Sequence, residues 1–128
     1  MTRAFKTLTF NKWATKNRIT DQMLNAVVTD IRKGLIDVDL GHYLIKQRIA
    51  IGNRGKSSGA RIIIGTNKTN YYFFIYGFKK NELYNIAKED EMLLREMAKK
   101  YFKLSSEQVA CAIKQGELIE VIYEEETI

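Results

Sequence analysis

The hydrophobic pattern in the middle of the chain predicts three β-strands, at Tyr43–Ile49, Arg61–Thr66 and Tyr71–Phe78. The third strand is apolar throughout most of its length, which is typical of a central strand in a sheet. Residues 66–70 are rich in Asn and Thr, which suit a tight turn. The second and third strands are therefore predicted to form an antiparallel hairpin.

The N-terminal third of the chain predicts a short strand and two helices. Residues 4–6 are expected to form an edge strand, and a first helix is expected over about residues 9–17. A second helix is predicted to run to about residue 33, because its apolar residues recur on one helical face. Thr20 suits the N-cap of this helix and Gly34 suits its end. The two helices are expected to form a helical hairpin.

The rest of the chain predicts a connector, two more helices and a last strand. Residues 35–42 are expected to be the connector, and a long helix is expected over residues 83–102. Ser105, with Gln108 three residues later, has the spacing of a capping box for a further helix. Residues 118–123 predict a final strand. The apolar side of the long helix is predicted to consist of Ile86, Leu93, Leu94, Met97 and Tyr101.

Together these elements predict one α+β domain over residues 1–128, with an N-terminal helical hairpin packed on an antiparallel sheet and with C-terminal helices. The order of the elements lacks the regular βαβ alternation of a dinucleotide-binding fold, and the glycine fingerprint of that fold is missing as well. Function therefore has to be sought on the sheet rather than in a nucleotide-binding crevice.

Composition narrows the class of protein. The chain is 45% hydrophobic and 28% charged, which is ordinary for a globular protein, and no apolar run approaches the ~20 residues of a membrane span. The N-terminus lacks the apolar run of a signal peptide, so a reducing cytoplasm is the expected location. The single cysteine, Cys111, excludes an internal disulfide and is expected in the core. The single histidine, His42, is expected to be a bystander, and no metal or other cofactor is predicted.

Charge is unevenly distributed along the chain. No Asp or Glu occurs between Gly41 and Asn81. The basic residues of that stretch are Lys46, Arg48, Arg54, Lys56, Arg61, Lys68, Lys79 and Lys80. A concentration of cations on one sheet attracts a polyanion, since neutralising phosphates releases their counterions. The net charge of +6 thus hides a stronger local basic region that is suited to a nucleic acid.

The loop between the first two predicted strands is basic and rich in glycine, with the sequence GNRGKSSG over residues 52–59. It differs from the P-loop of nucleotide triphosphatases, whose Gly-Lys-Ser/Thr follows a strand and opens a helix. Here the Gly-Lys-Ser leads into a strand. The sequence therefore excludes a P-loop triphosphatase, and the loop is either a phosphate-contacting element or a plain hairpin tip.

The basic residues of the first two strands have the chemistry that RNA cleavage without a metal requires. A base must take the proton of the 2′-hydroxyl, and donors must stabilise the charge that grows on the phosphate. A lysine can act as the base where neighbouring cations and burial depress its pKa, and Lys46 shares a strand face with Arg48, near Lys56 and Arg61. Arginine can clamp a phosphate through two hydrogen bonds. Composition alone favours a binding surface over a catalytic site.

Three motifs resemble the RelE/HigB superfamily of bacterial toxins from type II toxin–antitoxin systems. They are the paired basic residues of LIKQRIA, the basic loop that ends in Ser-Gly-Ala-Arg, and the apolar strand that closes as FFIYGFKKNE. The resemblance is sharpest from Leu44 to Glu82. It implies a microbial-ribonuclease-like fold and an mRNA endoribonuclease that acts in the A site of the 30S ribosomal subunit and inhibits translation. It also implies a co-expressed antitoxin that holds the toxin inactive.

The resemblance also assigns site residues by position. Its catalytic set corresponds to Lys46, Arg48, Lys56, Arg61 and Lys79, with Lys80 as the alternative to Lys79. Because arginine is a poor proton carrier, Lys46 is preferred to Arg48 as the general base. Substrate contacts are expected from Arg54, Ser57, Ser58, Tyr76, Lys80 and Tyr84. Residues 104–128 are expected to be a C-terminal extension that the shortest members of the family lack.

Three functions remain open from the sequence. The first is a metal-independent mRNA endoribonuclease toxin that requires the ribosome. The second is a ParE-like relative that inhibits DNA gyrase through protein contacts, and the third is a non-catalytic RNA-binding protein. Mutation distinguishes them, because Arg61→Ala should abolish cleavage in a nuclease but only weaken binding in a plain RNA-binding protein. The antitoxin is expected to lay an acidic helix or strand against the sheet or to displace the last helix.

Overall fold

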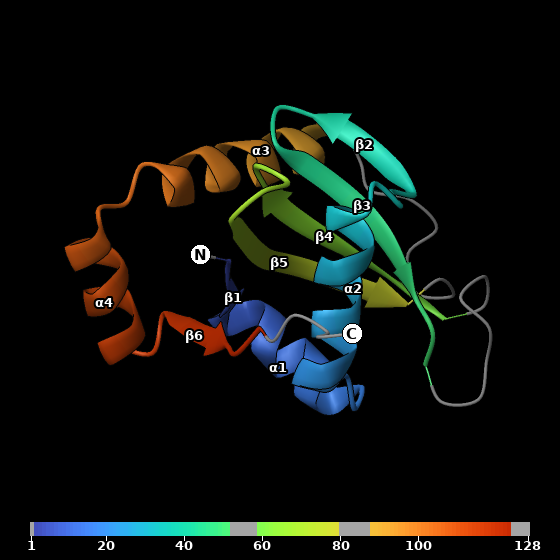
Figure 1. The fold of residues 1–128 in the computed structure, drawn as a ribbon, viewed down its shortest axis with the longest axis horizontal. Helices are drawn as coiled ribbons and strands as arrows, with labels where there is room; N and C mark the ends of the chain where they lie inside the picture. The colour runs from blue at the N-terminus through green and yellow to red at the C-terminus, as the bar shows by residue number, and fades with distance from the viewer. Residues whose placement is uncertain (1, 52–58, 80–87, 124–128) are drawn as a thin grey trace.

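A computed structural model describes residues 2–51, 59–79 and 88–123 of the chain (Figure 1). Ten helices and strands lie in these ranges. In chain order they are β1 (Arg3–Thr7), α1 (Leu8–Lys16), α2 (Asp21–Arg32), β2 (Val38–Gly41), β3 (Leu44–Ile49), β4 (Ala60–Thr66), β5 (Tyr71–Lys79), α3 (Lys88–Phe102), α4 (Ser106–Lys114) and β6 (Leu118–Val121). None of the described helices is long and apolar enough to cross a membrane.

The six described strands form one sheet in the order β2-β3-β4-β5-β1-β6. Strands β2 to β5 are successive antiparallel neighbours, and the predicted β4–β5 hairpin is confirmed. The mixed α+β class is confirmed too. The short strand predicted at residues 4–6 is confirmed as β1. The fold class that begins with a helical hairpin on a fully antiparallel sheet is wrong, because β1 comes first and pairs in parallel with β5.

Strand β1 is an interior strand, where the sequence predicted an edge. It lies between β5 and β6 and is buried from Ala4 to Thr7. Its polar residues are accommodated by specific partners. The ammonium of Lys6 donates to Asp21 at 2.8 Å, and the hydroxyl of Thr7 donates to the carbonyl of Ile75. These partners, which are distant in sequence, allow a strand with polar ends to sit inside the sheet.

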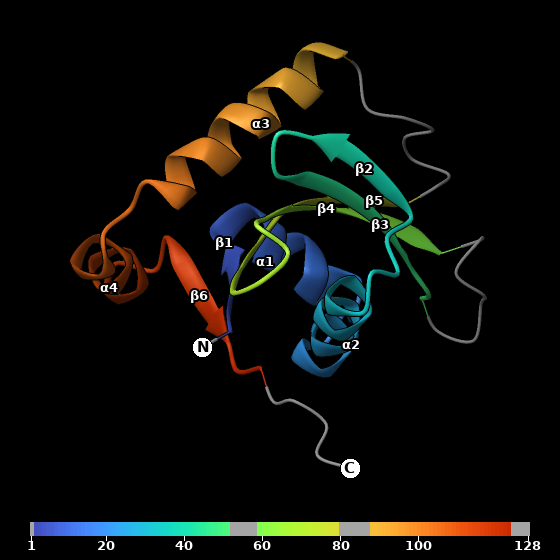
Figure 2. The same ribbon diagram turned by 45° about the horizontal axis from the view of Figure 1, so that its top comes forward.

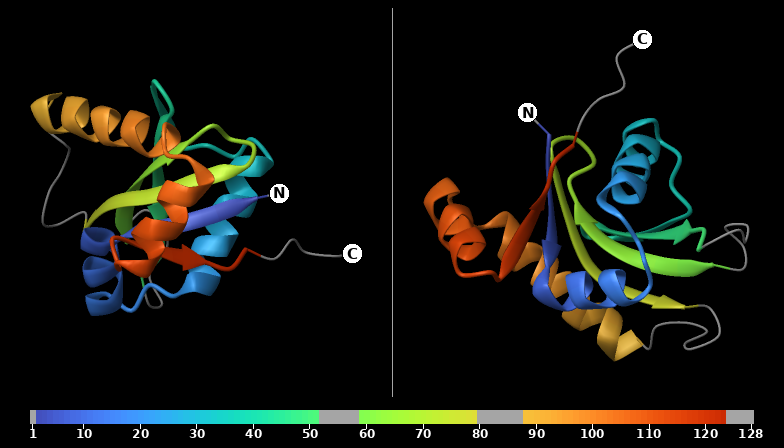
Figure 3. Two further views of the ribbon diagram at one scale, coloured as in Figure 1. Left: turned by 90° about the vertical axis from the view of Figure 1, so that its left-hand side faces the viewer. Right: turned by 90° about the horizontal axis from the view of Figure 1, so that it is seen from below.

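Helices α1 and α2 begin and end as their capping residues dictate. The hydroxyl of Thr7 accepts from the main-chain N–H of Phe10, and that of Thr20 accepts from Met23, which confirms Thr20 as an N-cap. Gly34 follows α2 with a φ of +82°, a backbone conformation that glycine adopts without strain. The two helices cover one face of the sheet, and α3 and α4 lie on the other (Figure 3).

The two faces of the sheet carry separate cores. The face under α1 and α2, here called the sealed face, includes Ile45, Ile62, Ile64, Tyr72 and Phe74. The face under α3 and α4, here called the open face, includes Leu44, Ile63, Phe73, Ile75 and Phe78. Because neighbouring residues of a strand point to opposite faces, each strand contributes to both cores.

The predicted connector over residues 35–42 contains strand β2, which pairs with β3 at the edge of the sheet. The connecting turn is unusual, because both central residues, His42 and Tyr43, have positive φ angles of 51° and 65°. Two-residue hairpins require this backbone, but they normally use Asn or Gly there. Strand β2 was not predicted from the sequence because it contains Asp39, and aspartate is rare in strands. In the structure its carboxylate accepts from the main-chain N–H of Gly41 at the turn.

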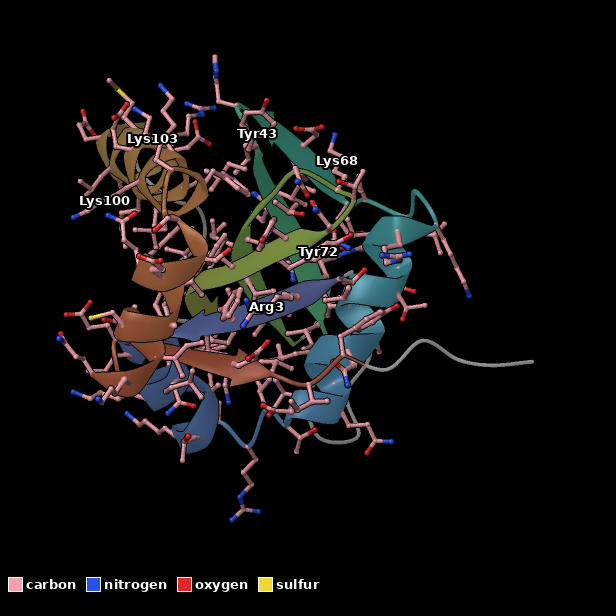
Figure 4. The ribbon with its side chains drawn as sticks, turned by 60° about the vertical axis from the view of Figure 1, so that its left-hand side comes forward. Arg3, Tyr43, Lys68, Tyr72, Lys100 and Lys103 are labelled. Carbon is pink, nitrogen blue, oxygen red and sulfur yellow. The ribbon has the colours of Figure 1, made fainter. Side chains whose placement is uncertain are left out.

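Helix α3 crosses the open face beside the β2–β3 hairpin (Figure 2). Leu94 and Ala98 point into the core, and the ring of Phe102 lies 5.5 Å from that of Tyr43. Figure 4 labels Tyr43 together with Lys100, in the last turn of α3, and Lys103, which directly follows the helix. The prediction that Leu93 faces the core is wrong, because it is 63% exposed. The predicted start of this helix at residue 83, and its residue Ile86, lie outside the described residues.

The C-terminal elements complete the sheet. The capping box is confirmed, since Ser105 and Gln108 each accept from the other's main-chain N–H at the start of α4. Strand β6 pairs with β1, and the guanidinium of Arg3 donates twice to the carboxylate of Glu120 (Arg3 is labelled in Figure 4). Cys111 is exposed on α4, so its predicted place in the core is wrong: the α4 residue buried in the open-face core is Val109.

Candidate functional site

The candidate site is the end of the open face that lies away from the C-terminal end of α3. Strand β3 places Lys46 and Arg48 there, because they alternate with the buried residues Ile45, Gln47 and Ile49. The antiparallel register then sets Arg61 of β4 directly opposite Arg48. The predicted face shared by Lys46 and Arg48 is thus confirmed, and Arg61 joins it.

A tyrosine completes this group. Ile63 pairs with Lys46 on one side and with Tyr76 of β5 on the other, so all three share a row across the open face. In the next row Arg61 lies between Arg48 and Phe78. The four side chains that offer polar chemistry on these two rows, here called the cradle, are Lys46, Arg48, Arg61 and Tyr76.

Tyr76 reaches the open face only because of a β-bulge. Ile64 pairs with Phe74 and Ile63 pairs with Tyr76, so Ile75 is an extra residue in β5. Without the bulge, strict alternation would place Tyr76 with Tyr72 and Phe74 on the sealed face. Tyr76 is 37% exposed, and its predicted contact with the substrate stays a prediction.

Gly77 allows the strand to continue after the bulge. A Cβ atom at this position would lie 2.3 Å from the ring of Trp13 on α1, far inside van der Waals contact. The ring of Trp13 therefore packs directly against the backbone of β5, one residue after Tyr76. Its packing on the sealed face supports the segment that turns Tyr76 toward the open face.

Three of the four cradle residues, the cations Lys46, Arg48 and Arg61, line a shallow cavity of about 320 Å³, and Tyr76 lies outside it. The residues around it are Asp37, Val38, Lys46, Arg48 and Arg61. Two arginines opposite each other on neighbouring strands repel, with Cβ atoms about 5 Å apart in such pairs. This repulsion is relieved by binding an anion between them. A phosphate fits the chemistry, since a guanidinium can give it two parallel hydrogen bonds.

Sequence reasoning missed one residue of this cavity, Asp37. Its carboxylate accepts from the main-chain N–H of Arg48 at 2.7 Å and from the guanidinium of Arg48 at 3.2 Å. The available signal was Gln47, a polar residue at a position of β3 that should be apolar. Gln47 is only 4% exposed, and its amide binds the chain just before β2, at Leu35 and Asp37.

Not every predicted site residue joins the cradle. Lys79 pairs with Ala60, whose side chain belongs to the sealed-face core, so the register places Lys79 on the opposite face from Arg61. The remaining predicted catalytic and substrate-binding residues lie outside the described residues. They are Arg54, Lys56, Ser57, Ser58, Lys80 and Tyr84.

Three groups whose pKa values are shifted lie away from the cradle. A hydrogen bond from Lys68, helped by the N–H of Gly41, lowers the pKa of Asp39 at the far end of the β2–β3 hairpin. Burial raises the pKa of Tyr72 and of Tyr101, which lie in the sealed-face core and on α3. Within the described ranges, no three His, Cys, Asp or Glu side chains gather as metal ligands would.

The chain matches a known protein family. The family model described as "RelE toxin of RelE / RelB toxin-antitoxin system" matches residues 2–121, nearly the whole chain. The chain therefore belongs to the RelE toxin family, so it is a toxin of a toxin–antitoxin system and has a cognate antitoxin as its partner. The match includes α4 and most of the segment expected to be an extension. A search of curated proteins found no match to the chain.

Proposed function

We propose that this toxin is an mRNA endoribonuclease that inhibits translation by cutting mRNA on the ribosome, without a metal ion. The observation that carries the proposal is the cradle, which places three cations and a tyrosine on one accessible surface of the sheet. Toxins of the RelE family are generally endoribonucleases, which supports the same reading. The compartment that fits this function is the cytoplasm.

The chemistry assigned to the cradle is an internal transesterification. Lys46 takes the proton from the 2′-hydroxyl as its oxygen attacks the adjacent phosphorus. The bond from phosphorus to the 5′-oxygen breaks, which leaves a 2′,3′-cyclic phosphate and a 5′-hydroxyl. Arg48 and Arg61 hold the phosphoryl oxygens as negative charge grows on them. The proton for the leaving 5′-oxygen is assigned in this proposal to Lys56, a member of the predicted catalytic set that lies outside the described residues.

Tyr76 is proposed to contact a nucleobase of the RNA rather than the phosphate. Its ring lies 6.1 Å from that of Phe78, and both stand on the open face next to the row of arginines. Stacking of a base on an aromatic ring contributes about 1–3 kcal/mol and tolerates any base. Tyr76 would thus hold the nucleotide next to the scissile bond, while the arginines hold the phosphate.

A cleavage assay on a defined mRNA, with and without translating ribosomes, tests the proposal. The expected result is cleavage on ribosomes, with a 2′,3′-cyclic phosphate on one side of the cut and a 5′-hydroxyl on the other. Lys46→Ala should abolish it, whereas Lys114→Ala on α4 removes the same charge far from the cradle and should not. Cleavage of free RNA would remove the ribosome requirement. A 3′-hydroxyl with a 5′-phosphate at the cut would contradict the proposed metal-independent attack by the 2′-hydroxyl.

The two alternative functions give different outcomes in the same experiment. Absence of cleavage in all conditions, together with inhibition of DNA supercoiling, would indicate a ParE-like gyrase inhibitor. Absence of cleavage together with tight RNA binding, lost gradually as Lys46, Arg48 and Arg61 are replaced one by one, would indicate a plain RNA-binding protein.

A further inference from the structure

Among the described residues that line the cavity, Asp37 is the one carboxylate, and the others are three cations and Val38. We propose that Asp37 is a positioning residue for Arg48, which it holds in the orientation that receives the scissile phosphate. The inference rests on the proposed function, because it assigns Arg48 to the phosphate. It concerns a residue that no motif of the sequence singles out.

The contacts of Asp37 fix both the backbone and the side chain of Arg48. One carboxylate oxygen accepts the main-chain N–H at 2.7 Å and the other accepts Nη2 at 3.2 Å. The pairing of β2 with β3 begins at Val38 and Lys46, so the carboxylate acts as the acceptor where the ladder of main-chain bonds has ended. A single side chain thus ties the guanidinium to the strand that carries it.

Asp37 is itself held from the opposite side of β3. The buried amide of Gln47 accepts from the main-chain N–H of Asp37 at 2.7 Å and donates to the carbonyl of Leu35 at 3.1 Å. Because Gln47 is 4% exposed, this clamp is shielded from competing water. The clamp fixes the backbone of Asp37, and Asp37 in turn fixes Arg48, so the chain of contacts begins in the core and ends in the cradle.

The negative charge of Asp37 offsets the repulsion between Arg48 and Arg61. Arg48 lies opposite Arg61, and without a nearby anion the two guanidinium groups would turn away from each other. The carboxylate of Asp37 keeps Arg48 in place before any phosphate arrives. Contact through Nη2 uses one of the five N–H donors of arginine, so the group can bind carboxylate and phosphate at once. A donor fixed in advance stabilises the transition state without reorganising during the reaction.

The carboxylate of Asp37 also weakens the affinity for RNA, because a negative charge in the cavity repels the phosphates. The inference therefore predicts opposite effects on two measured quantities. Replacing Asp37 should slow the cleavage step while it leaves RNA affinity unchanged or makes it tighter. A residue that only shaped the fold would lower both.

The test compares Asp37→Asn with Asp39→Asn in single-turnover cleavage and RNA-binding assays. Asp39 is a matched control, since it lies two residues farther along the chain, within β2, and forms its own ion pair with Lys68 outside the cavity. Asp37→Asn should slow cleavage by about 10- to 100-fold, the range expected for a misplaced catalytic group. Asp39→Asn should match the wild type. Equal rates for the two variants would overturn the inference.

A double-mutant cycle separates action through Arg48 from any other role. In a chain that already carries Arg48→Ala, Asp37→Ala should slow cleavage by less than about twofold further, because the group that it positions is gone. Loss of the same size in both backgrounds would show that Asp37 acts independently of Arg48, and the inference would be wrong.

A measurement that needs no cleavage keeps the inference testable if the proposed function fails. Side-chain NMR of nitrogen-15-labelled arginine reports the mobility of each guanidinium. Arg48 should be rigid in the wild-type chain and in Asp39→Asn, and mobile in Asp37→Asn. Equal mobility of Arg48 in all three would overturn the positioning role, whereas absence of cleavage by the wild type would overturn only the endoribonuclease proposal.

Discussion

The two faces of the sheet are built from the same strands but are completed differently. Strand β3 sends Ile45, Gln47 and Ile49 to the sealed face, where all three are buried. It sends Leu44 to the part of the open face that α3 covers. Farther along the same face, Lys46 and Arg48 are partly or fully exposed. One strand thus serves a closed core on one side and an accessible surface on the other.

The two faces differ in whether their side chains serve folding or are available for function. On the sealed face, and under α3, apolar side chains are required because they are removed from water. At the end of the open face that no described helix covers, burial imposes no such requirement, so charged residues can occupy strand positions without a large loss of stability. Substitutions on the two faces should therefore affect different measured quantities.

The largest expected difference in stability is between Phe74 and Arg61. Phe74 is fully buried on the sealed face against Phe10, so Phe74→Ala should lower the free energy of unfolding by about 3–5 kcal/mol. Arg61→Ala should change it by about 0.5 kcal/mol or less, because its recorded bond is a long one to Ala60 and its loss removes repulsion from Arg48. Urea unfolding measures both. Comparable losses would contradict the separation of the two faces.

The next largest expected effect concerns the packing of Trp13 against Gly77 on the sealed face of β5. Gly77→Ala should lower the free energy of unfolding by about 1–3 kcal/mol, because the added methyl group collides with the ring of Trp13. Thermal unfolding measures the loss. A smaller side chain at position 13 in the same chain should recover part of it. No loss on Gly77→Ala would mean that Trp13 does not pack on this strand as described.

A smaller effect is expected at the edge strand β6. Glu120→Gln should lower the free energy of unfolding by about 0.5–1 kcal/mol. It breaks an ion pair with Arg3 that has two hydrogen bonds and in which both side chains are about one-third exposed. The loss should shrink as salt is added. Glu96→Gln is the control, since its pair with Lys99 is 3.5 Å long and more exposed, and it should change nothing measurable. Equal effects would show that β6 gains nothing from the pair.

The smallest expected effect is a dependence of the unfolding free energy on alkaline pH, caused by two buried tyrosines. Burial holds the pKa of Tyr72 and Tyr101 above the usual value of 10.0, so the folded chain keeps both phenols neutral after the unfolded chain ionises them. Their contribution to stability is full below about pH 10 and is lost as the pH rises through the folded-state pKa. Tyr72→Phe with Tyr101→Phe should therefore flatten the alkaline fall in unfolding free energy. Parallel curves for variant and wild type would contradict the burial of these groups.

Periodicity predicted the parts of the fold in which a strand or helix has a regular apolar face. The strands β3, β4 and β5, the caps at Thr20 and Ser105, and the shared face of Lys46 and Arg48 all follow from local sequence. These features depend on residues within a few positions of one another. They are therefore visible without knowledge of the tertiary structure.

The remaining features depend on contacts that are distant in sequence. Strand β1 is interior because Asp21 neutralises Lys6 and because β6 covers its other edge. The bulge that turns Tyr76 appears only in the register between β4 and β5. Asp37 enters the cavity because Gln47 holds its backbone from across the strand. None of these partners is marked by spacing along the chain.

The central claim is that the uncovered end of the open face carries out RNA cleavage. Its most direct test is the single-turnover cleavage rate of Arg61→Ala at saturating RNA, with the unfolding free energy measured on the same sample. Arg18→Ala, which removes an arginine from the α1–α2 link on the other side of the sheet, is the control. The account predicts a fall in rate of about 10²–10³-fold for Arg61→Ala with nearly unchanged stability. An unchanged rate, or a loss shared equally by Arg18→Ala, would contradict it.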